Sequence, residues 1–329
     1  MPLEYRNVRD LNQCVADNLH KIPQDVNLIV GIPRSGMLPA MMLALYLDLP
    51  VTDLQGLLEG RLMQGGDRTR FIPEHDHCKA LVVDDSIFTG AALKQVRAEI
   101  AAANLPHEVL YCSIYVRADR VNDVDIYFEQ LEGSKWLFEW NKFNHGMVPS
   151  LCVDFDGVLC RDPLREEDDD GERYRHFLET AEPKFRPRRK IGWIVTSRLE
   201  KYRPQTEEWL ARHGVEYGDL RMMDLPTLQD RTPWKAMQFK AQVYGDTRSS
   251  LFVESHLGQA EQICRLSGRP VLCIQNGELL RPNNLQAAAG RFHRVRRRMW
   301  RQLMARIAPS AAKVRSGGAL SSRGDSFGS

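Results

Sequence analysis

Two adjacent aspartates follow a short apolar run in the stretch ALVVDDSIFTGAAL, residues 80–93. Paired like charges rarely end a buried strand unless a partner outside the strand neutralises them. Adjacent carboxylates suit a sugar, because its hydroxyl groups donate hydrogen bonds to them, often with a divalent cation nearby. Small residues then form a turn whose backbone N–H groups can bind a phosphate where a helix begins. The stretch predicts a site for a phosphorylated ribose; the alternative is an aspartate pair that caps an ordinary helix. The residues assigned to this site are Asp84, Asp85, Ser86, Thr89 and Gly90.

A second pattern of strand, tight loop and helix lies about fifty residues earlier, in NLIVGIPRSGMLPA. An apolar run ends at Gly31, and Arg34, Ser35 and Gly36 follow before a helix-like segment. An arginine in such a loop can bind phosphate groups. Because the carboxyl ends of parallel strands meet at one edge of a sheet, we expect this loop to lie beside the paired aspartates. The alternative is a surface turn.

Together the two motifs resemble those of the type I phosphoribosyltransferase family, over roughly residues 1–148. The resemblance implies that VVDDSIFTG binds phosphoribosyl pyrophosphate (PRPP) and that GIPRSG contacts its pyrophosphate. It also implies a loop that covers the pyrophosphate, and Glu59–Phe71 has the expected place and composition. The sequence leaves open whether Arg61 or Arg68 of that loop reaches the ligand.

The stretch LCVDFDGVLC places Asp154 and Asp156 two positions apart after an apolar run, with Gly157 to make a turn. This pattern resembles the first motif of the haloacid dehalogenase (HAD) superfamily. The resemblance implies that Asp154 attacks phosphorus and forms an aspartyl-phosphate. It implies that Asp156 protonates the leaving alcohol and later activates water. It also implies Mg²⁺ as cofactor, because a cation offsets the negative charge that gathers during phosphoryl transfer.

Two further motifs of that superfamily can be placed along the chain. Thr196 ends the apolar run of GWIVTSR, and its hydroxyl is expected to hold a phosphoryl oxygen. The stretch TPWKAMQFKAQVYG offers Lys235 and Lys240 for the lysine that neutralises the intermediate. We prefer Lys240 because it lies nearer the following strand, and Lys235 stays open.

A metal site is expected after the run SLFVES, which ends on Glu254. The superfamily usually has paired acids here, whereas Ser255 follows in this chain. We expect Glu254 to bind Mg²⁺ together with the Asp154 carboxylate and the Asp156 carbonyl, with waters completing the coordination.

The strands that must position these residues fall into two blocks of apolar runs. The first block contains NLIVGI, ALVVDD and EVLYCSIYV, and the second contains LCVDFDGVL, IGWIVTS, SLFVES and RPVLCIQ. Helix-like segments alternate with these runs, as in α/β proteins with parallel sheets. We predict an α/β chain with two Rossmann-like parallel-sheet domains, a phosphoribosyltransferase domain over 1–148 and a HAD-like phosphatase domain over 149–280. A basic amphipathic helix and disordered tail are predicted over 281–329.

The second block leaves little room for a cap domain, since only about 34 residues separate Leu159 from the run around Trp193. An uncapped site admits a bulky phosphorylated molecule, or one that another domain holds. The acidic run REEDDDGERYRH in this segment is expected to be a solvated loop rather than a metal site.

The composition is that of a globular protein, with 43% hydrophobic and 27% charged residues among 329. Seven scattered cysteines without a CxxC pair indicate reduced thiols rather than a disulfide framework or zinc site. The N-terminus shows no basic and apolar leader, so we expect a cytoplasmic protein.

The C-terminal tail differs in charge from the rest of the chain. From Leu279 to Ser329 there are eleven Lys or Arg and one acid, whereas residues 1–278 have a net charge of −8. Apolar residues recur there at helical spacing, flanked by arginines. We favour binding to an anionic membrane surface, ahead of docking on the acidic body of the protein and of nucleic-acid binding. The apolar positions are Phe292, Val295, Met299, Leu303 and Ile307.

The two resemblances together suggest transfer of phosphoribose from PRPP, followed by removal of the 5-phosphate. This order leaves a plain ribofuranose, as in the PRPP-dependent ribofuranosyltransferase systems of bacterial polysaccharide synthesis that the chain resembles. The expected acceptor is then a glycan carried on a lipid, because an open phosphatase site and a tail at the membrane surface both suit a large, lipid-linked molecule. Two alternatives are a nucleobase phosphoribosyltransferase with a nucleotide phosphatase, and a PRPP-sensing regulator. The regulator is less favoured because a sensor needs no aspartyl nucleophile.

Overall fold

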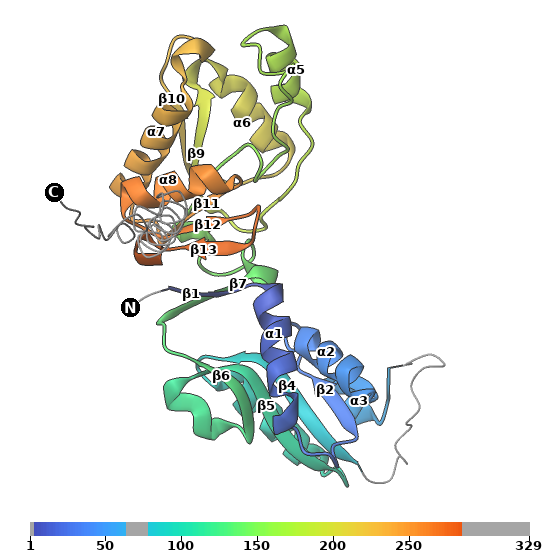
Figure 1. Cartoon of the computed structure of the whole chain (residues 1–329). Helices are drawn as coiled ribbons and strands as arrows, with labels where there is room; N and C mark the ends of the chain where they lie inside the picture. Colours follow the sequence, from blue (N-terminus) through green and yellow to red (C-terminus); the bar gives the residue numbers. More distant parts are fainter. Residues whose placement is uncertain (1–2, 64–77, 285–329) are drawn as a thin grey trace, which may run out of the picture. The chain divides into compact units, whose positions relative to one another are not determined.

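The computed structural model describes residues 3–63 and 78–284 of the chain. The described elements alternate between strands and helices and build two separate central sheets (Figure 1). The basic tail from residue 285 and the segment 64–77, which includes Arg68, lie outside the described residues.

The first central sheet has five strands in the order β3-β2-β4-β5-β6, and every pair is parallel. Its strands are β2 (Leu28–Gly31), β3 (Val51–Asp53), β4 (Lys79–Ile87), β5 (Glu108–Arg117) and β6 (Ile126–Leu131). Its helices are α1 (Val8–Asn18), α2 (Met37–Leu47), α3 (Leu54–Glu59) and α4 (Ala91–Ala103).

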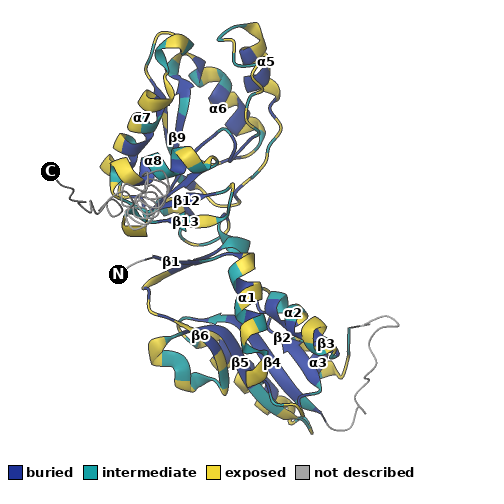
Figure 2. Cartoon of the chain, in the orientation of Figure 1, coloured by how far each residue is buried: buried dark blue, intermediate teal, exposed yellow. Residues whose placement is uncertain are grey.

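Both faces of this sheet are buried, because successive side chains of a strand point to opposite faces. Leu81 and Val83 of β4 pack in one core cluster with side chains of α1 and α2. Ala80 and Val82 pack in another with side chains of α3 and α4. The continuous apolar runs of the sequence therefore correspond to strands covered on both faces, which are dark blue in Figure 2.

The second central sheet has six strands in the order β10-β9-β8-β11-β12-β13. Among these described strands only β12 and β13 pair antiparallel. The predicted α/β class with two parallel sheets is confirmed. The strands are β8 (Leu151–Val153), β9 (Ile191–Leu199), β10 (Tyr217–Met223), β11 (Leu251–Glu254), β12 (Val271–Cys273) and β13 (Glu278–Leu280). The helices are α5 (Glu172–Thr180), α6 (Arg203–Arg212), α7 (Pro233–Asp246) and α8 (Leu257–Ser267).

A separate two-stranded parallel sheet joins β1 (Leu3–Arg6) to β7 (Lys135–Phe138). Neither strand was expected from the sequence, because each has four residues and its partner is distant in the chain. No helix within the described residues has the length and apolar content needed to cross a membrane.

Candidate functional site

The first site lies where β2 and β4 run side by side. β2 ends at Gly31, opposite Val83, while β4 continues to Ile87 with β5 as its remaining partner. Asp84 and Asp85 therefore lie inside β4, although the sequence suggested that the strand ends before them. The reason is that Asp84 still pairs with a residue of β5. Past the end of β2, one edge of β4 is open to the loop that follows Gly31.

That loop turns back onto β4 and brings Ser35 to the aspartates. The Ser35 hydroxyl donates a hydrogen bond of 3.0 Å to Oδ1 of Asp85. Gly36 is needed for this close approach, because a Cβ atom there would lie 2.6 Å from the Ile32 carbonyl oxygen and 2.7 Å from that of Val83. Arg34 is exposed, and its guanidinium makes no hydrogen bond or ion pair with any described residue. The two sequence motifs thus meet, with a free cation beside them.

The two aspartates differ in their surroundings. Asp85 accepts hydrogen bonds at Oδ1 from the hydroxyls of Ser35 and Ser86, at 3.0 and 3.2 Å, and at Oδ2 from the indole N–H of Trp140, at 2.8 Å. Asp84 is 8% exposed, and its Oδ1 accepts only the N–H of Asp85 among the described residues. Burial and the neighbouring Asp85 charge raise the pKa of Asp84 to about 8. Asp84 thus has backbone donors but no hydroxyl donor from a described side chain, and a polyhydroxyl ligand would supply one.

Trp140 was not identified from the sequence. Its ring stacks on Phe138, with centroids 4.8 Å apart and 6° between the planes. It lies in a short 3₁₀ helix after β7, more than fifty residues from Asp85. Nothing local in the sequence links the two, so only the tertiary structure reveals the contact.

The turn after β4 opens α4 without a side-chain cap. Gly90 has φ +77°, a conformation that glycine adopts without strain, and the backbone N–H groups beyond it begin the helix. A cavity of about 530 Å³ lies against this turn. Three basic side chains line this cavity, and none of them was identified from the sequence. Two of the three lie three positions apart on α4, a spacing that could have indicated a shared face. The three are Lys94, Arg97 and Arg120. Asp123 also lines this cavity and pairs with Arg120 at 3.5 Å. The helix start together with Lys94 and Arg97 can still bind a phosphate group.

The loop expected to cover a pyrophosphate is only partly described. Arg61 is exposed and pairs with Glu59 at 3.0 Å, which gives no indication of a ligand contact. Arg68 lies outside the described residues, so the choice between the two arginines stays open.

The second site lies at the carboxyl ends of β8 and β11, which are parallel neighbours. Asp154 follows β8 and Glu254 ends β11. Between them lies Lys240 of α7, whose Nζ donates hydrogen bonds of 2.8 Å to Oδ2 of Asp154 and 2.8 Å to Oε2 of Glu254. All three side chains are buried. Lys235 is exposed in the first turn of the same helix and does not line the cavity at this second site, which is described below.

The pKa values of Asp154 and Lys240 depend on each other and on Glu254. Burial and the Glu254 charge raise the pKa of Asp154 well above its ordinary value, although Lys240 acts in the opposite direction. Burial alone would lower the pKa of Lys240, but Asp154 and Glu254 raise it above its ordinary value. Two buried carboxylates thus share one ammonium group, and an additional cation would find excess negative charge there.

A divalent cation fits the donors at this site in chemical type. Asp154 and Glu254 supply carboxylate oxygens, and the Asp156 carbonyl accepts a 3.4 Å hydrogen bond from the Ser255 hydroxyl, which places it near Glu254. Ser255 also donates its N–H to Oε1 of Glu254 at 2.9 Å and so orients that carboxylate. Oxygen donors suit Mg²⁺. No group of three or more His, Cys, Asp or Glu side chains within the described ranges has metal-binding geometry, so any such ion would need backbone and water oxygens.

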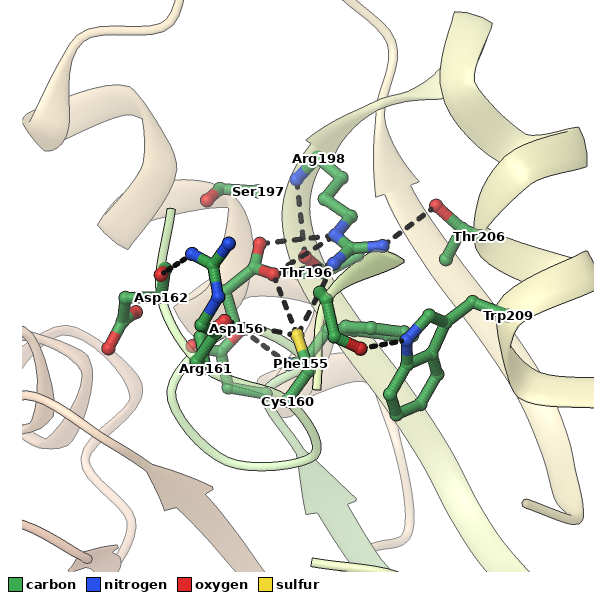
Figure 3. Close-up of polar contacts among 12 residues, drawn as sticks. Phe155, Asp156, Cys160, Arg161, Asp162, Thr196, Ser197, Arg198, Thr206 and Trp209 are labelled. Atoms are coloured by element: carbon green, nitrogen blue, oxygen red, sulfur yellow. Dashed lines mark hydrogen bonds and ion pairs between the residues drawn. The ribbon is translucent and has the colours of Figure 1, made fainter. Parts of the chain in front are cut away.

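Asp156 has a partner that the sequence analysis missed (Figure 3). The guanidinium of Arg198 donates hydrogen bonds to its carboxylate at 2.6, 3.1 and 3.2 Å. Arg198 lies on β9, two residues after Thr196, and is fully buried. The Thr196 hydroxyl accepts the N–H of Arg198 at 3.2 Å and is itself fully buried. Ser197, rather than Thr196, lines the cavity.

The cavity at the second site has a volume of about 570 Å³. Asp154, Asp156 and Lys240 line it. Other lining residues carry carboxylate, amide, imidazole and guanidinium groups. They are Asp162, Asp168, Arg231, His256, Gln259 and Gln262. Such groups can bind a phosphate together with the hydroxyl groups of a sugar.

The acidic run beside this cavity is anchored, although it was expected to be a solvated loop. Asp168 pairs with Arg231 at 2.9 Å, and Asp169 accepts the N–H groups of Gly171 and Tyr174 where α5 begins. Asp170 accepts hydrogen bonds from Lys201 and from the Tyr202 hydroxyl. The sequence did not indicate these contacts, because most of the partner residues come from other segments of the chain. The second part of the expectation, that these acids are not a metal site, remains a prediction.

Comparison with known proteins gave structural matches only. No protein-family model and no curated protein matches the chain. A purine phosphoribosyltransferase from Pyrococcus horikoshii Ot3 matches at 19% identity and TM-score 0.32, over 43% of this chain and 94% of that one. The Helicobacter pylori xanthine-guanine-hypoxanthine phosphoribosyltransferase matches at 17% identity and TM-score 0.33, over 43% and 93%. A hypothetical protein from Neisseria gonorrhoeae with bound ppGpp matches at 16% identity and TM-score 0.33, over 42% and 89%.

Proposed function

We propose that the first site transfers phosphoribose from PRPP to an acceptor. The observation that carries this proposal is the Ser35–Asp85 hydrogen bond, which joins the GIPRSG loop to the paired aspartates at one edge of a parallel sheet. Asp84 would accept the ribose hydroxyls, and the turn at Thr89 and Gly90 would bind the 5-phosphate. Arg34, exposed beside the aspartates, would attract the pyrophosphate.

In the transfer step, a nucleophilic atom of the acceptor forms a bond to C1 of the ribose as the bond from C1 to pyrophosphate breaks. Pyrophosphate leaves with the electron pair, and the acceptor's proton passes to a base or to water. The contribution of this chain is to hold the ribose and both phosphate ends in fixed positions, which lowers the entropic part of the barrier.

We infer a second activity, removal of the 5-phosphate, at the site around Asp154. A carboxylate of Asp154 attacks phosphorus, the bond to the sugar oxygen breaks, and that oxygen takes a proton from Asp156. Water, losing a proton to Asp156, then releases phosphate from Asp154. Lys240 stabilises the charge on the transferred group. Asp154, Glu254 and the Asp156 carbonyl would hold Mg²⁺, which neutralises phosphate charge when bound.

The two activities in succession leave an unphosphorylated ribofuranose on the acceptor. We propose that the acceptor is a glycan, carried on a lipid, in the synthesis of a cell-surface polysaccharide. The polar walls of the second cavity support a sugar substrate, because amide and carboxylate groups pair with hydroxyls. The basic tail, which lies outside the described residues, would keep the enzyme at an anionic membrane surface. The tail is not proposed as a nucleic-acid binding element.

The decisive experiment incubates the full chain with PRPP, Mg²⁺ and a panel of acceptors that includes lipid-linked glycans, synthetic glycans and free nucleobases, with mass spectrometry as readout. We expect ribosylated glycan without phosphate from the wild-type protein, and a product heavier by one phosphate from Asp154→Asn. Ribosylated nucleobase instead of glycan would favour the alternative of a nucleobase enzyme. Absence of any product, with PRPP bound but not consumed, would favour a PRPP sensor.

A further inference from the structure

Arg198 is a fully buried cation that contacts Asp156, one of the residues lining the second cavity. Its Nε and one terminal nitrogen contact both oxygens of Asp156, which is itself part of the cavity lining. Figure 3 shows the guanidinium directed at this carboxylate. A planar guanidinium with two nitrogens on one carboxylate fixes the orientation of that carboxylate as well as its position.

The guanidinium is held from its other sides as well. Its second terminal nitrogen donates a 3.3 Å hydrogen bond to the Thr206 hydroxyl on α6. Its central carbon lies 3.8 Å from the centroid of the Phe155 ring, and Cys160 Sγ lies 3.5 Å from the nitrogen that binds Asp156. Aromatic and thiol groups from the segment after β8 and a hydroxyl group from α6 thus leave the side chain little freedom to move.

Such an arrangement is not explained by stability alone. Burying an ion pair often stabilises a fold less than apolar side chains of similar volume would, because desolvation of both ions opposes their attraction. Asp156 keeps one face toward the cavity, so the pair is not closed off as a purely structural pair would be. Proton transfer at a defined position requires a carboxylate that is fixed in place and still faces the cavity.

We propose that Arg198 is a positioning residue, which holds the Asp156 carboxylate at the point where it exchanges protons with the leaving oxygen and with the attacking water. This inference rests on the proposed phosphatase activity. In the first step the phosphorus–oxygen bond of the ester breaks and a proton moves from Asp156 to the leaving oxygen. In the second step a proton moves from water to Asp156 as water oxygen bonds to phosphorus and Asp154 is released.

The test compares phosphate esters that differ in leaving group, using Arg198→Lys in the full chain. For an alkyl phosphate such as ribose 5-phosphate, the leaving oxygen needs a proton, so kcat/KM should fall about 100-fold. For p-nitrophenyl phosphate the leaving group needs none, so kcat/KM should stay within about 3-fold of the wild-type value. Because the water step still needs Asp156, this variant should also show a pre-steady-state burst of nitrophenolate.

Two further variants keep the test informative. Arg203→Lys makes the same substitution in a surface ion pair with Glu200 and should leave both substrates unaffected. Thr206→Val removes one partner of the guanidinium with little change in shape, and should give the same selective loss at smaller size if Arg198→Lys does not fold. Equal losses on both substrates, without a burst, would overturn the positioning role. If the wild-type protein hydrolyses neither ester, the phosphatase proposal fails instead.

Discussion

At the scale of single residues, both sites contain carboxylates whose surroundings do not stabilise their charge. Asp85 has donors at both oxygens, whereas Asp84 beside it is buried with backbone donors. At the second site, Asp154 and Glu254 share one lysine. Functional sites commonly retain such unfavourable electrostatics, because the ligand supplies the missing partner.

Replacing Asp84 by asparagine should stabilise the ligand-free protein in a pH-dependent manner. The folded-state pKa of about 8 exceeds the ordinary value of 3.8. The folded protein therefore binds more protons than the unfolded chain between these values, and its stability falls as pH rises through this window. The variant lacks this loss, so its advantage in unfolding free energy should be near zero at pH 4 and reach about 5 kcal/mol at pH 8, since each unit of pKa difference corresponds to about 1.4 kcal/mol.

Urea unfolding at several pH values measures this difference. The exposed Asp246→Asn is the matched control and should shift stability by less than about 0.5 kcal/mol at every pH. A constant advantage of Asp84→Asn from pH 4 to 8 would contradict the assigned environment of Asp84. The same variant should transfer phosphoribose poorly, because an amide cannot replace a carboxylate that accepts two sugar hydroxyls.

Lys240→Met should destabilise the fold by about 3 kcal/mol, because it leaves two buried carboxylates without their shared cation. Lys235→Met is the control, since Lys235 is exposed, and should cost less than about 0.5 kcal/mol. Added Mg²⁺ should restore part of the stability of Lys240→Met, as judged by thermal unfolding with and without the ion. Equal effects of the two substitutions would contradict the assignment of Lys240.

At the scale of elements, the sequence predicts which segments are strands better than where they end. The apolar runs of β4 and β9 are evident, yet both strands extend past the expected residues. Their length depends on how far a neighbouring strand continues, which is a tertiary property. The four-residue strands β1 and β7 escape detection for a related reason, since only their pairing stabilises them.

The residues of the candidate sites also divide into those that the sequence predicts and those that only the structure reveals. Asp84, Asp85, Asp154 and Glu254 could be found because each follows or ends an apolar run. Trp140 could not, because its contact with Asp85 joins segments 55 positions apart. Arg198 lies in a visible motif, but no pattern shows that it binds Asp156, 42 positions earlier. Sequence periodicity locates side chains at the ends of strands, whereas contacts across elements require the structure.

The loop between β2 and α2 offers a prediction at this scale. A methyl group at Gly36 would approach two backbone carbonyl oxygens within 2.7 Å, so Gly36→Ala must displace the loop from β4. We expect a loss of about 2 kcal/mol in stability, as for other overpacked sites, and weaker PRPP binding by calorimetry. Gly146→Ala, where a methyl group meets open space, should change neither. Normal PRPP binding by Gly36→Ala would contradict the assignment of this loop to the PRPP site.

At the scale of the whole molecule, residues 1–280 form one compact unit that contains both central sheets, and the sequence from residue 281 is basic. The described residues hold one candidate site on each central sheet. At the first site Asp84 and Asp85 of β4 lie just past the carboxyl end of the neighbouring strand β2, and at the second the acids lie at the carboxyl ends of β8 and β11. This is the edge at which open α/β sheets bind ligands. The net charge of −8 over residues 1–278 contrasts with eleven basic residues from Leu279 onward.

The tail should bind vesicles that contain anionic lipid, with an affinity that falls as salt rises. Each Lys or Arg near such a surface contributes about 1 kcal/mol. Vesicle sedimentation should therefore retain the full-length protein and release a version truncated after Leu280. The truncated protein should still act on a short soluble acceptor. Equal binding of the full-length protein to neutral and anionic vesicles, or unfolding of the truncated protein, would contradict the membrane role.

The hydrogen bond between the Trp140 indole and Asp85 has a spectroscopic consequence. Indole emission depends on what its N–H group contacts, and sugar hydroxyls that reach Asp85 would compete for the same carboxylate oxygen. Addition of PRPP should therefore change the intrinsic fluorescence of the protein, and Trp140→Phe should abolish that change although five other tryptophans remain. Stopped-flow mixing would then time the arrival of the donor before any bond is made or broken. The chain thus contains a fluorophore that reports donor occupancy without a label.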